Sequence, residues 1–406
     1  MSDATKSRVT TAGVATLIIA LLAGGCSSAP PTPGPPSDPN NIPATSACGL
    51  FAAECVSLAG ATPWALNVAD FDADGDLDLI VVNFGADNVT VLRNDGTAAF
   101  TADANYAVSD NPQSVAVGDW DGDGDIDAAV TSGMVVSLLR NQGDGTFTPV
   151  VNIDLTEPPA RIVTADLDAN GTADLVTANG FPDNVSILLN SGTGTFTPSS
   201  VVVGNSLATL GSIDVGDING DGWLDLVVTR RADTVSILIA TSPATFAAPA
   251  EIAIGTNHIL NDVKLADLND DGNLDLIVAD NGDAFDTADT GSIVLHLNDG
   301  TGLFGAPTRI LAGNRPVSVA AADLDGDDDT DLAVANNMSD DVSLLWNRGD
   351  GTFAAAEQVG VGDGPVFVIA ADLDGDGDAD LAVANMNSNT VAILLNDGAG
   401  QFAMGT

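Results

Sequence analysis

The sequence predicts an all-β protein, a seven-bladed β-propeller of four-stranded antiparallel blades, and three observations support this. A nonapeptide of the form DxDxDGxxD, or a close variant, occurs seven times, with first residues 47 to 56 positions apart. That period is typical of a four-stranded blade. Short runs of Val, Ile, Leu and Ala are bounded by Gly and Asn turns, as strands are. Eight hairpin-type phenylalanines accompany the seven nonapeptides, so we expect the two chain ends to share one blade.

Each repeat contains four expected strands in the same order. An apolar strand such as Ser114–Gly118 enters the nonapeptide, a second strand leaves it, and a third carries the pattern VSILLN, as in Val185–Asn190. A hairpin of the form NxGxGxF, as in Asn347–Phe353, then opens the fourth strand, with glycines that supply the positive φ of such turns. The fourth hairpin, TSPATF at 241–246, lacks these glycines. The residue before each nonapeptide is always Ala or Gly, which suits strands crowded around an axis.

The nonapeptides are candidate calcium sites. Carboxylates held a few Å apart raise one another's pKa and repel, so a loop that gathers them favours a cation. Side chains at positions 1, 3, 5 and 9, with the backbone carbonyl of position 7, resemble the roughly six to eight oxygen ligands of Ca²⁺. Position 6 is glycine in six loops and Asp328 in the sixth; glycine there permits a positive φ.

We expect up to seven structural Ca²⁺ ions. Their candidate ligands, in loop order, are Asp70, Asp72, Asp74, Asp76 and Asp78; Asp119, Asp121, Asp123, Asp125 and Asp127; Asp166, Asp168, Asn170, Thr172 and Asp174; Asp217, Asn219, Asp221, Trp223 and Asp225; Asp267, Asn269, Asp271, Asn273 and Asp275; Asp323, Asp325, Asp327, Asp329 and Asp331; and Asp372, Asp374, Asp376, Asp378 and Asp380.

Two alternatives compete with this interpretation. An EF-hand loop also begins DxDxDG, but it needs a glutamate at position 12 and flanking helices. Position 12 is Val81, Val130 or Val383 in three of the loops, and the flanking segments have strand patterns. The other alternative is a solvated acidic loop without metal. Seven recurrences of the ligand spacing favour a metal over solubility alone.

The blocks around GTFTP, GLFGAP and GTFAA, joined to VAVGDWDGDGDIDAAV and VIAADLDGDGDADLAVAN, resemble the FG-GAP or VCBS repeats of integrin α-type β-propellers. The resemblance covers about residues 49–406. It implies that each nonapeptide is the hairpin between the two inner strands of a blade and binds Ca²⁺. It also places ligand binding at the opposite face, which would make the calcium structural.

Ring closure is predicted from the ends of the chain. Phe402 lies four residues from the C-terminus, too close to it for a full outer strand. Phe51 heads the stretch FAAECVSL, which parallels FAAAEQVG at Phe353. We therefore expect an N-terminal strand to complete the last blade and leave only short protected edges.

The N-terminal region predicts an anchor. Lys6 and Arg8 precede an apolar run and the sequence LAGGC, so residues 1–25 are expected to be a lipoprotein signal peptide and Cys26 its lipidation site. A retained transmembrane helix is the alternative, although the run is shorter than the roughly 20 residues that a span needs. Residues 26–47 are expected to be a proline-rich tether and residues 48–406 the propeller.

This organisation predicts a location in the bacterial cell envelope, lipid-anchored at the outer membrane or cell surface. Cys48 and Cys55 are the other cysteines. In an oxidising compartment they could form a disulfide only if the strand between them bends, and the sequence leaves this open.

The charge of the chain limits its partners. The formal net charge is −46, and 31 of the 53 aspartates lie in the nonapeptides. Such an acidic chain is unsuited to nucleic acid or to an anionic membrane surface. We expect a monomer that contacts the membrane only through its lipid anchor and binds an extracellular protein or glycan.

The expected ligand face is the end of the ring away from the nonapeptides. Its candidate residues lie just before the innermost strands, with His258 in a neighbouring loop. The others are Trp64, Gln113, Arg161, Asn261, Asp262, Arg315 and Phe367. The fifth repeat carries an insertion at 281–292 with three aspartates, either an acidic surface loop or a lectin-like or additional metal site. Lys264 and Asp214 could meet in the channel, as a salt bridge or as an acid and base pair.

Nothing in the sequence resembles a nucleophile elbow, a phosphate loop or a Cys/His metal cluster. We therefore expect no enzyme activity, and interpret the chain as a calcium-stabilised surface binding or adhesion module. The alternative is a lectin or a polysaccharide-acting, lyase-like enzyme on the same scaffold.

Overall fold

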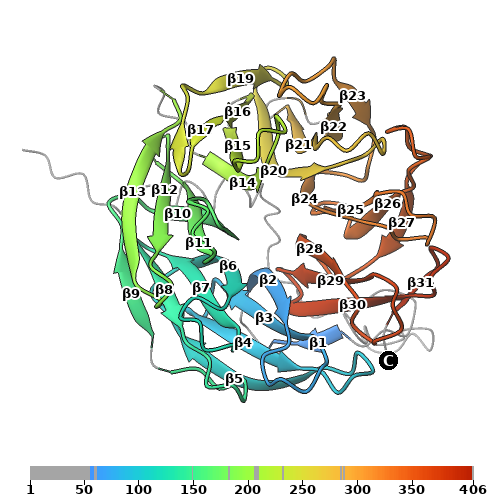
Figure 1. Ribbon diagram of the computed structural model, residues 1–406. Helices are drawn as coiled ribbons and strands as arrows, with labels where there is room; N and C mark the ends of the chain where they lie inside the picture. The colour runs from blue at the N-terminus through green and yellow to red at the C-terminus, as the bar shows by residue number, and fades with distance from the viewer. Residues whose placement is uncertain are drawn as a thin grey trace, which may run out of the picture. The chain divides into compact units, whose positions relative to one another are not determined.

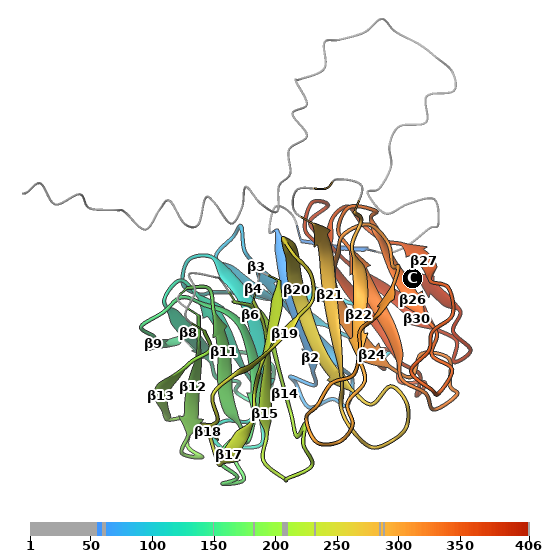
Figure 2. The same cartoon turned by 90° about the horizontal axis from the view of Figure 1, so that it is seen from above.

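The computed structural model describes residues 55–58, 62–148, 150–181, 183–204, 210–230, 233–283, 286 and 289–404. All of these belong to the unit Ser46–Thr406. Within it, seven antiparallel sheets surround a central axis (Figure 1). Figure 2 shows the ring from the side, with the strands crossing its thickness. The predicted all-β, seven-bladed propeller is confirmed.

The first six blades contain their strands in chain order from the axis outward, and the seventh does so for its first three strands. The innermost strands are β2 (Pro63–Ala69), β6 (Pro112–Gly118), β10 (Pro159–Ala165), β14 (Leu210–Gly216), β20 (His258–Ala266), β24 (Pro316–Ala322) and β28 (Pro365–Ala371). The second strands are β3 (Asp78–Asn83), β7 (Asp127–Ser132), β11 (Asp174–Asn179), β15 (Asp225–Arg230), β21 (Asp275–Asp283), β25 (Asp331–Asn336) and β29 (Asp380–Asn385).

The third strands are β4 (Asn88–Arg93), β8 (Val135–Leu139), β12 (Asn184–Asn190), β16 (Thr234–Leu238), β22 (Ser292–His296), β26 (Asp341–Leu345) and β30 (Thr390–Asn396). The outer strands of the first six blades are β5 (Thr101–Ala107), β9 (Val151–Asp154), β13 (Phe196–Val202), β19 (Ala250–Ala253), β23 (Thr308–Ile310) and β27 (Glu357–Gly360). In the fourth blade a small hairpin, β17 (Ala240–Ser242) and β18 (Thr245–Phe246), precedes β19.

Burial explains the composition of the strands. The second strands have every residue buried through their first six positions, because each lies in a sheet packed on both faces against neighbouring blades. A sheet covered on both faces selects near-continuous Val, Leu, Ile and Ala runs. The outer strands are mostly exposed, and their sequences are correspondingly polar.

The last blade is completed by both ends of the chain. The N-terminal strand β1 (Cys55–Ser57) pairs with Thr390–Ala392 of β30. The C-terminal strand β31 (Phe402–Met404) pairs with Leu394–Asn396 of β30. The expected N-terminal closing strand is therefore present, and β31 occupies the other half of the same edge.

Several predictions fall outside the described residues: the signal peptide, Cys26, the tether and Cys48. Among the described residues, no helix has the length and apolarity needed to cross a membrane.

Candidate metal loops and channel mouth

The seven nonapeptides form hairpins between the innermost and second strands of their blades, all at one end of the ring. In the first loop, Asp70 accepts backbone N–H bonds from Asp74 (3.2 Å) and Gly75 (3.1 Å). The first aspartate of every other loop likewise accepts the N–H of position 6. These bonds fold each loop tightly around its first carboxylate.

Two positions of each loop have positive φ. Position 6 has φ between +85° and +100° where it is glycine, and Asp328 has φ +71° there. Position 4 is also left-handed in all seven loops, with the residues Ala73, Gly122, Ala169, Gly220, Asp270, Gly326 and Gly375. The sequence indicated only the first of these two turns, because alanine and aspartate stand at position 4 in three loops.

The last aspartate of each loop is buried and begins the second strand. In the third loop, Asp174 accepts backbone N–H bonds from Leu167 (2.9 Å) and Asn190 (2.7 Å). Asp275 makes the same two bonds with Leu268 (3.1 Å) and Asn298 (2.7 Å). This carboxylate therefore joins the loop to the end of the third strand, in addition to any contact with a metal.

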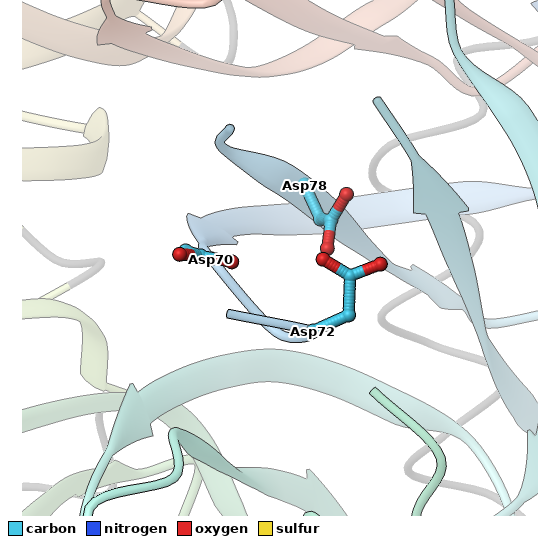
Figure 3. Close-up of side chains that lie close together, drawn as sticks. All are labelled: Asp70, Asp72 and Asp78. Atoms are coloured by element: carbon cyan, nitrogen blue, oxygen red, sulfur yellow. The ribbon is translucent and has the colours of Figure 1, made fainter. Parts of the chain in front are cut away.

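Carboxylates from separate positions converge in five of the loops. Figure 3 shows Asp72 and Asp78 pointing toward one another with Asp70 beside them. In each cluster one carboxylate oxygen per residue lies within 4.8 Å of the others: Asp70, Asp72 and Asp78; Asp119, Asp121 and Asp123; Asp166, Asp168 and Asp174; Asp323, Asp325 and Asp331; and Asp372, Asp374 and Asp380. The fourth and fifth loops have Asn219 and Asn269 at position 3, which places an amide oxygen where the others have a carboxylate.

These clusters could hold metal ions, and their unpaired oxygens fit that role. Asp72 Oδ1, Asp121 Oδ1 and Asp325 Oδ1 are buried and, within the described part of the chain, accept no hydrogen bond. Burial, and then the neighbouring carboxylates, also raise the pKa of Asp325. A hard cation bound to oxygen ligands would satisfy these atoms and offset the repulsion.

Arginines stand beside two of the loops. Arg93 contacts Asp72 and donates to the carbonyl of Asp144 in the next blade at 2.6 Å. Arg140 pairs with Asp121 at 2.6 Å and donates to the carbonyl of Gly194 in the following blade at 3.2 Å. The corresponding residues of the other blades are uncharged, namely Leu189, Ile239, Leu297, Trp346 and Leu395.

Position 2 of each loop links neighbouring blades, a role that the sequence interpretation missed. Its side chains are apolar and almost fully buried: Phe71, Trp120, Leu167, Ile218, Leu268, Leu324 and Leu373. Its backbone carbonyl accepts a hydrogen bond from an asparagine Nδ2 of the next blade. The carbonyl of Ile218, for example, accepts from Asn298 at 2.7 Å. The fourth blade has Ala240 instead of that asparagine, and there the backbone N–H of Ala244 donates to Leu167 at 2.9 Å. An apolar residue at position 2 in all seven nonapeptides was the available signal.

The opposite end of the channel is built from seven equivalent positions with different side chains. The residue five places before each first aspartate is Ala65, Ser114, Arg161, Ser212, Asp262, Ser318 or Phe367. All except Ala65 line a cavity of about 460 Å³ in the channel. The structure brings three of the predicted ligand residues together here: the Arg161 guanidinium lies 4.5 Å from the Phe367 ring centroid and 3.8 Å from Asp262 Oδ1.

The other predicted ligand residues lie outside this cavity lining. Trp64 packs against Phe84 with ring centroids 5.3 Å apart, and Asn261 donates to the carbonyl of Pro316 at 3.4 Å. His258 Nδ1 lies 2.8 Å from the Asp280 carboxylate. Gln113 and Arg315 are half-buried near the starts of β6 and β24.

Lys264 and Asp214 both line the channel. Burial raises the pKa of Asp214, and the positive charge of Lys264 lowers it.

In the fifth blade, the insertion extends β21 to Asp283, and β22 begins at Ser292. His296 Nδ1 contacts the carbonyl of Gly305 at 2.8 Å.

Six overlapping stretches match the FG-GAP-like repeat family, namely residues 70–130, 119–177, 166–228, 217–278, 267–334 and 323–383. The chain belongs to this family. Each FG-GAP stretch runs from the first aspartate of one nonapeptide into the second strand of the following blade, so the family repeat covers the inter-blade contacts described above. No curated protein matches the sequence.

Solved structures share the fold. An Agrocybe aegerita lectin, described as recognising non-reducing terminal N-acetylglucosamine, is 21% identical with a TM-score of 0.56, covering 83% of this chain and 92% of that one. BBS1N, solved in complex with ARL6DN, is 13% identical with a TM-score of 0.60, covering 86% and 99%. A Lactobacillus plantarum protein is 16% identical with a TM-score of 0.59, covering 79% and 91%. At these identities the likeness concerns the fold alone.

Proposed function

We propose that this FG-GAP propeller is a surface binding or adhesion module, stabilised by Ca²⁺ in its nonapeptide loops and anchored by a lipid on Cys26. The face at the channel mouth would bind an extracellular protein or glycan. The observation that carries the proposal is the contrast between the two ends of the ring. One end repeats an aspartate at the first and last positions of every nonapeptide, whereas equivalent positions at the other end carry different polar, charged and aromatic groups.

Calcium is the metal proposed because the donor set consists of carboxylate, amide and carbonyl oxygens, without His or Cys. Hard divalent cations prefer such ligands, and Ca²⁺ tolerates irregular geometry. The metal-bound loops would then stabilise the propeller fold, and they lie at the end away from the proposed ligand face.

A glycan ligand has specific support. The lectin with the same fold is described as recognising a terminal sugar, and Trp64 and Phe84 form an aromatic pair near the start of β2, at the channel-mouth end. The aromatic surface of such a pair is suited to packing against an apolar face of a sugar ring. A lectin is therefore the second candidate function.

Binding can be tested with the full chain on a glycan array and on immobilised extracellular proteins, with and without Ca²⁺. We expect Trp64→Ala to reduce binding. Trp223→Ala changes the same residue type at the loop end and keeps the backbone carbonyl that position 7 would offer to a metal, so it should leave binding unchanged. Loss of binding in Trp223→Ala alone would place the ligand at the loop end and contradict the proposal.

The anchor is tested separately by following radiolabelled fatty acid and membrane fractionation. The wild-type chain should be labelled and should sediment with membranes, whereas Cys26→Ser should be unlabelled. A labelled Cys26→Ser chain would contradict lipidation at this residue.

A further inference from the structure

The channel cavity contains four charged side chains: Arg161, Lys264, Asp214 and Asp262. They lie on three neighbouring blades, and their formal charges cancel. A cavity of about 460 Å³ is large enough for a small organic molecule. Asp262 and Arg161 differ in whether they already have hydrogen-bond partners within the protein.

Both carboxylate oxygens of Asp262 already accept hydrogen bonds from groups other than arginine. Its Oδ1 accepts from the Ser212 hydroxyl at 2.7 Å and from the N–H of Val263 at 3.1 Å. Its Oδ2 accepts from the N–H of Val319 at 3.0 Å. These three donors belong to three adjacent blades, so Asp262 holds the innermost strands together. The guanidinium of Arg161 is only a distant neighbour of this carboxylate, at 3.8 Å.

Arg161 differs from Asp262 in its hydrogen bonding. Phe367 covers the face of its guanidinium, but among the described residues no hydrogen-bond acceptor is paired with its N–H groups. Its side chain is 16% exposed, and burial lowers its pKa while Asp262 raises it. Its guanidinium nitrogens are not fully buried, so they remain accessible from the cavity without a protein acceptor. The stacked face leaves the edges of the guanidinium, which carry the N–H groups, available to a ligand in the cavity.

Two serines add neutral donors to the cavity wall. Ser114 Oγ accepts the backbone N–H of Ile162 at 3.4 Å, and Ser318 Oγ accepts that of Val368 at 3.4 Å. A hydroxyl that accepts a bond still has its own proton to donate. Ser114 is on the blade next to Arg161, at the equivalent position of its strand. Both hydroxyls can therefore donate to an anion in the cavity.

We propose that the channel mouth is a binding site for a small carboxylate, held by two parallel N–H···O bonds from Arg161 with hydroxyl donors from the serine positions. The planar fork of arginine matches a carboxylate in this way. Asp214 and Asp262 in the same cavity disfavour a dianion, so a monocarboxylate is preferred over phosphate. The carboxylate belongs either to a free organic acid or to a uronic acid at the end of a glycan.

The site can be tested by calorimetry on the full chain with sodium acetate, sodium glucuronate, glucose and inorganic phosphate. We expect acetate and glucuronate to bind with one ligand per chain, phosphate to bind more weakly, and glucose to show no Arg161-dependent binding. Tighter binding of a short uronate oligomer than of free glucuronate would identify a glycan as the source, and equal binding would identify a free acid.

Arg161→Met should weaken carboxylate binding about tenfold or more, because it removes charge-assisted hydrogen bonds. Arg161→Lys should recover only part of the affinity, since lysine keeps the charge but lacks the fork. Arg348→Met is the control, because Arg348 lies in a hairpin at the loop end, and it should bind as wild type does.

Ser114→Ala provides a test that leaves every charge in place, and it should weaken binding several-fold with little change in melting temperature. The proposal is overturned if the wild-type chain binds neither carboxylate at tens of millimolar. It is also overturned if folded Arg161→Met binds acetate as tightly as wild type, which would make Arg161 only a plug of the channel.

Discussion

The two ends of this propeller use repetition in opposite ways. At the loop end, all seven blades place an aspartate at the first and last positions of the nonapeptide and an apolar side chain at the second. At the channel mouth, the seven equivalent positions hold five different residue types, including arginine, aspartate and phenylalanine. The first pattern reflects residues that every blade needs in order to fold. The second pattern makes the blades differ from one another, although the fold repeats the same blade seven times.

The two ends differ in what their side chains contribute to the stability of the fold. The last aspartate of each loop binds backbone N–H groups in its own blade, and the second residue packs against the next blade. Removing these groups should affect folding. At the mouth, Arg161 stacks on Phe367 from a different blade, so the same strands carry groups that folding does not require in every blade.

The largest effect expected is from metal removal. A ligand that binds only the folded state stabilises it by about 2.7 kcal/mol per site when its free concentration is 100-fold above the dissociation constant. With several loops occupied, chelation should lower the melting temperature strongly, as measured by calorimetry in Ca²⁺ and in chelator. An unchanged melting temperature would show that metal binding does not stabilise the loop end.

The next largest effect is expected at a buried last aspartate. Asp275→Ala leaves the N–H groups of Leu268 and Asn298 buried without acceptors, which should cost about 3 kcal/mol in the free energy of unfolding. The matched change at the mouth is Ser318→Ala, which removes a 3.4 Å contact and should cost under about 1 kcal/mol. Urea denaturation measures both. Equal losses would erase the distinction between the two ends.

A pH dependence should distinguish the metal-free from the loaded loops. Burial raises the pKa of Asp78, Asp127, Asp331 and Asp380 from 3.8 to about 6. The folded metal-free state therefore holds protons that the unfolded state has released, so its added stability is present below about pH 4 and is lost as the pH rises through about 6.

Melting temperatures in chelator should accordingly fall between about pH 4 and pH 6. In saturating Ca²⁺ the trend should reverse, because the ligands must be ionised to bind the metal. A melting temperature that rises with pH in both conditions would show that the last aspartates ionise freely in the metal-free fold.

Much of the architecture could be predicted because it is repeated. The period, the strand order and the loop positions each recur seven times, so a chance match in one blade is corrected by the others. The N-terminal closing strand was predicted from the count of phenylalanines. The sharing of that edge with β31 was not, because Phe402 is followed by only four residues and three residues of pairing are too short to show a strand pattern.

The sites were less predictable for physical reasons. Arg161, Asp262 and Phe367 were each identified as candidate ligand residues, but their meeting depends on side chains that reach across a channel from different blades. The bonds from Asn298 and its equivalents to the preceding blade also join residues at least 70 positions apart, as for Asn298 and Ile218, which are 80 apart. Local patterns show which residues face an axis, but not which of them touch there.

The smallest effect is expected at the one loop that lacks glycine at position 6. Asp328 has φ +71° where the other loops have glycine, and an L-residue in that region costs roughly 1–2 kcal/mol. Asp328→Gly should therefore stabilise the metal-free protein by about 1 kcal/mol, measured by urea denaturation. Asp328→Asn separates the contributions, because it removes the charge and keeps the side chain, so any gain beyond it reports backbone strain. Asp110→Gly makes the same substitution at an exposed residue without a positive φ and should destabilise by about 0.5–1 kcal/mol, since glycine gains freedom in the unfolded chain. If Asp328→Gly destabilises as Asp110→Gly does, the left-handed position carries no strain, and the sixth loop tolerates aspartate as readily as the others tolerate glycine.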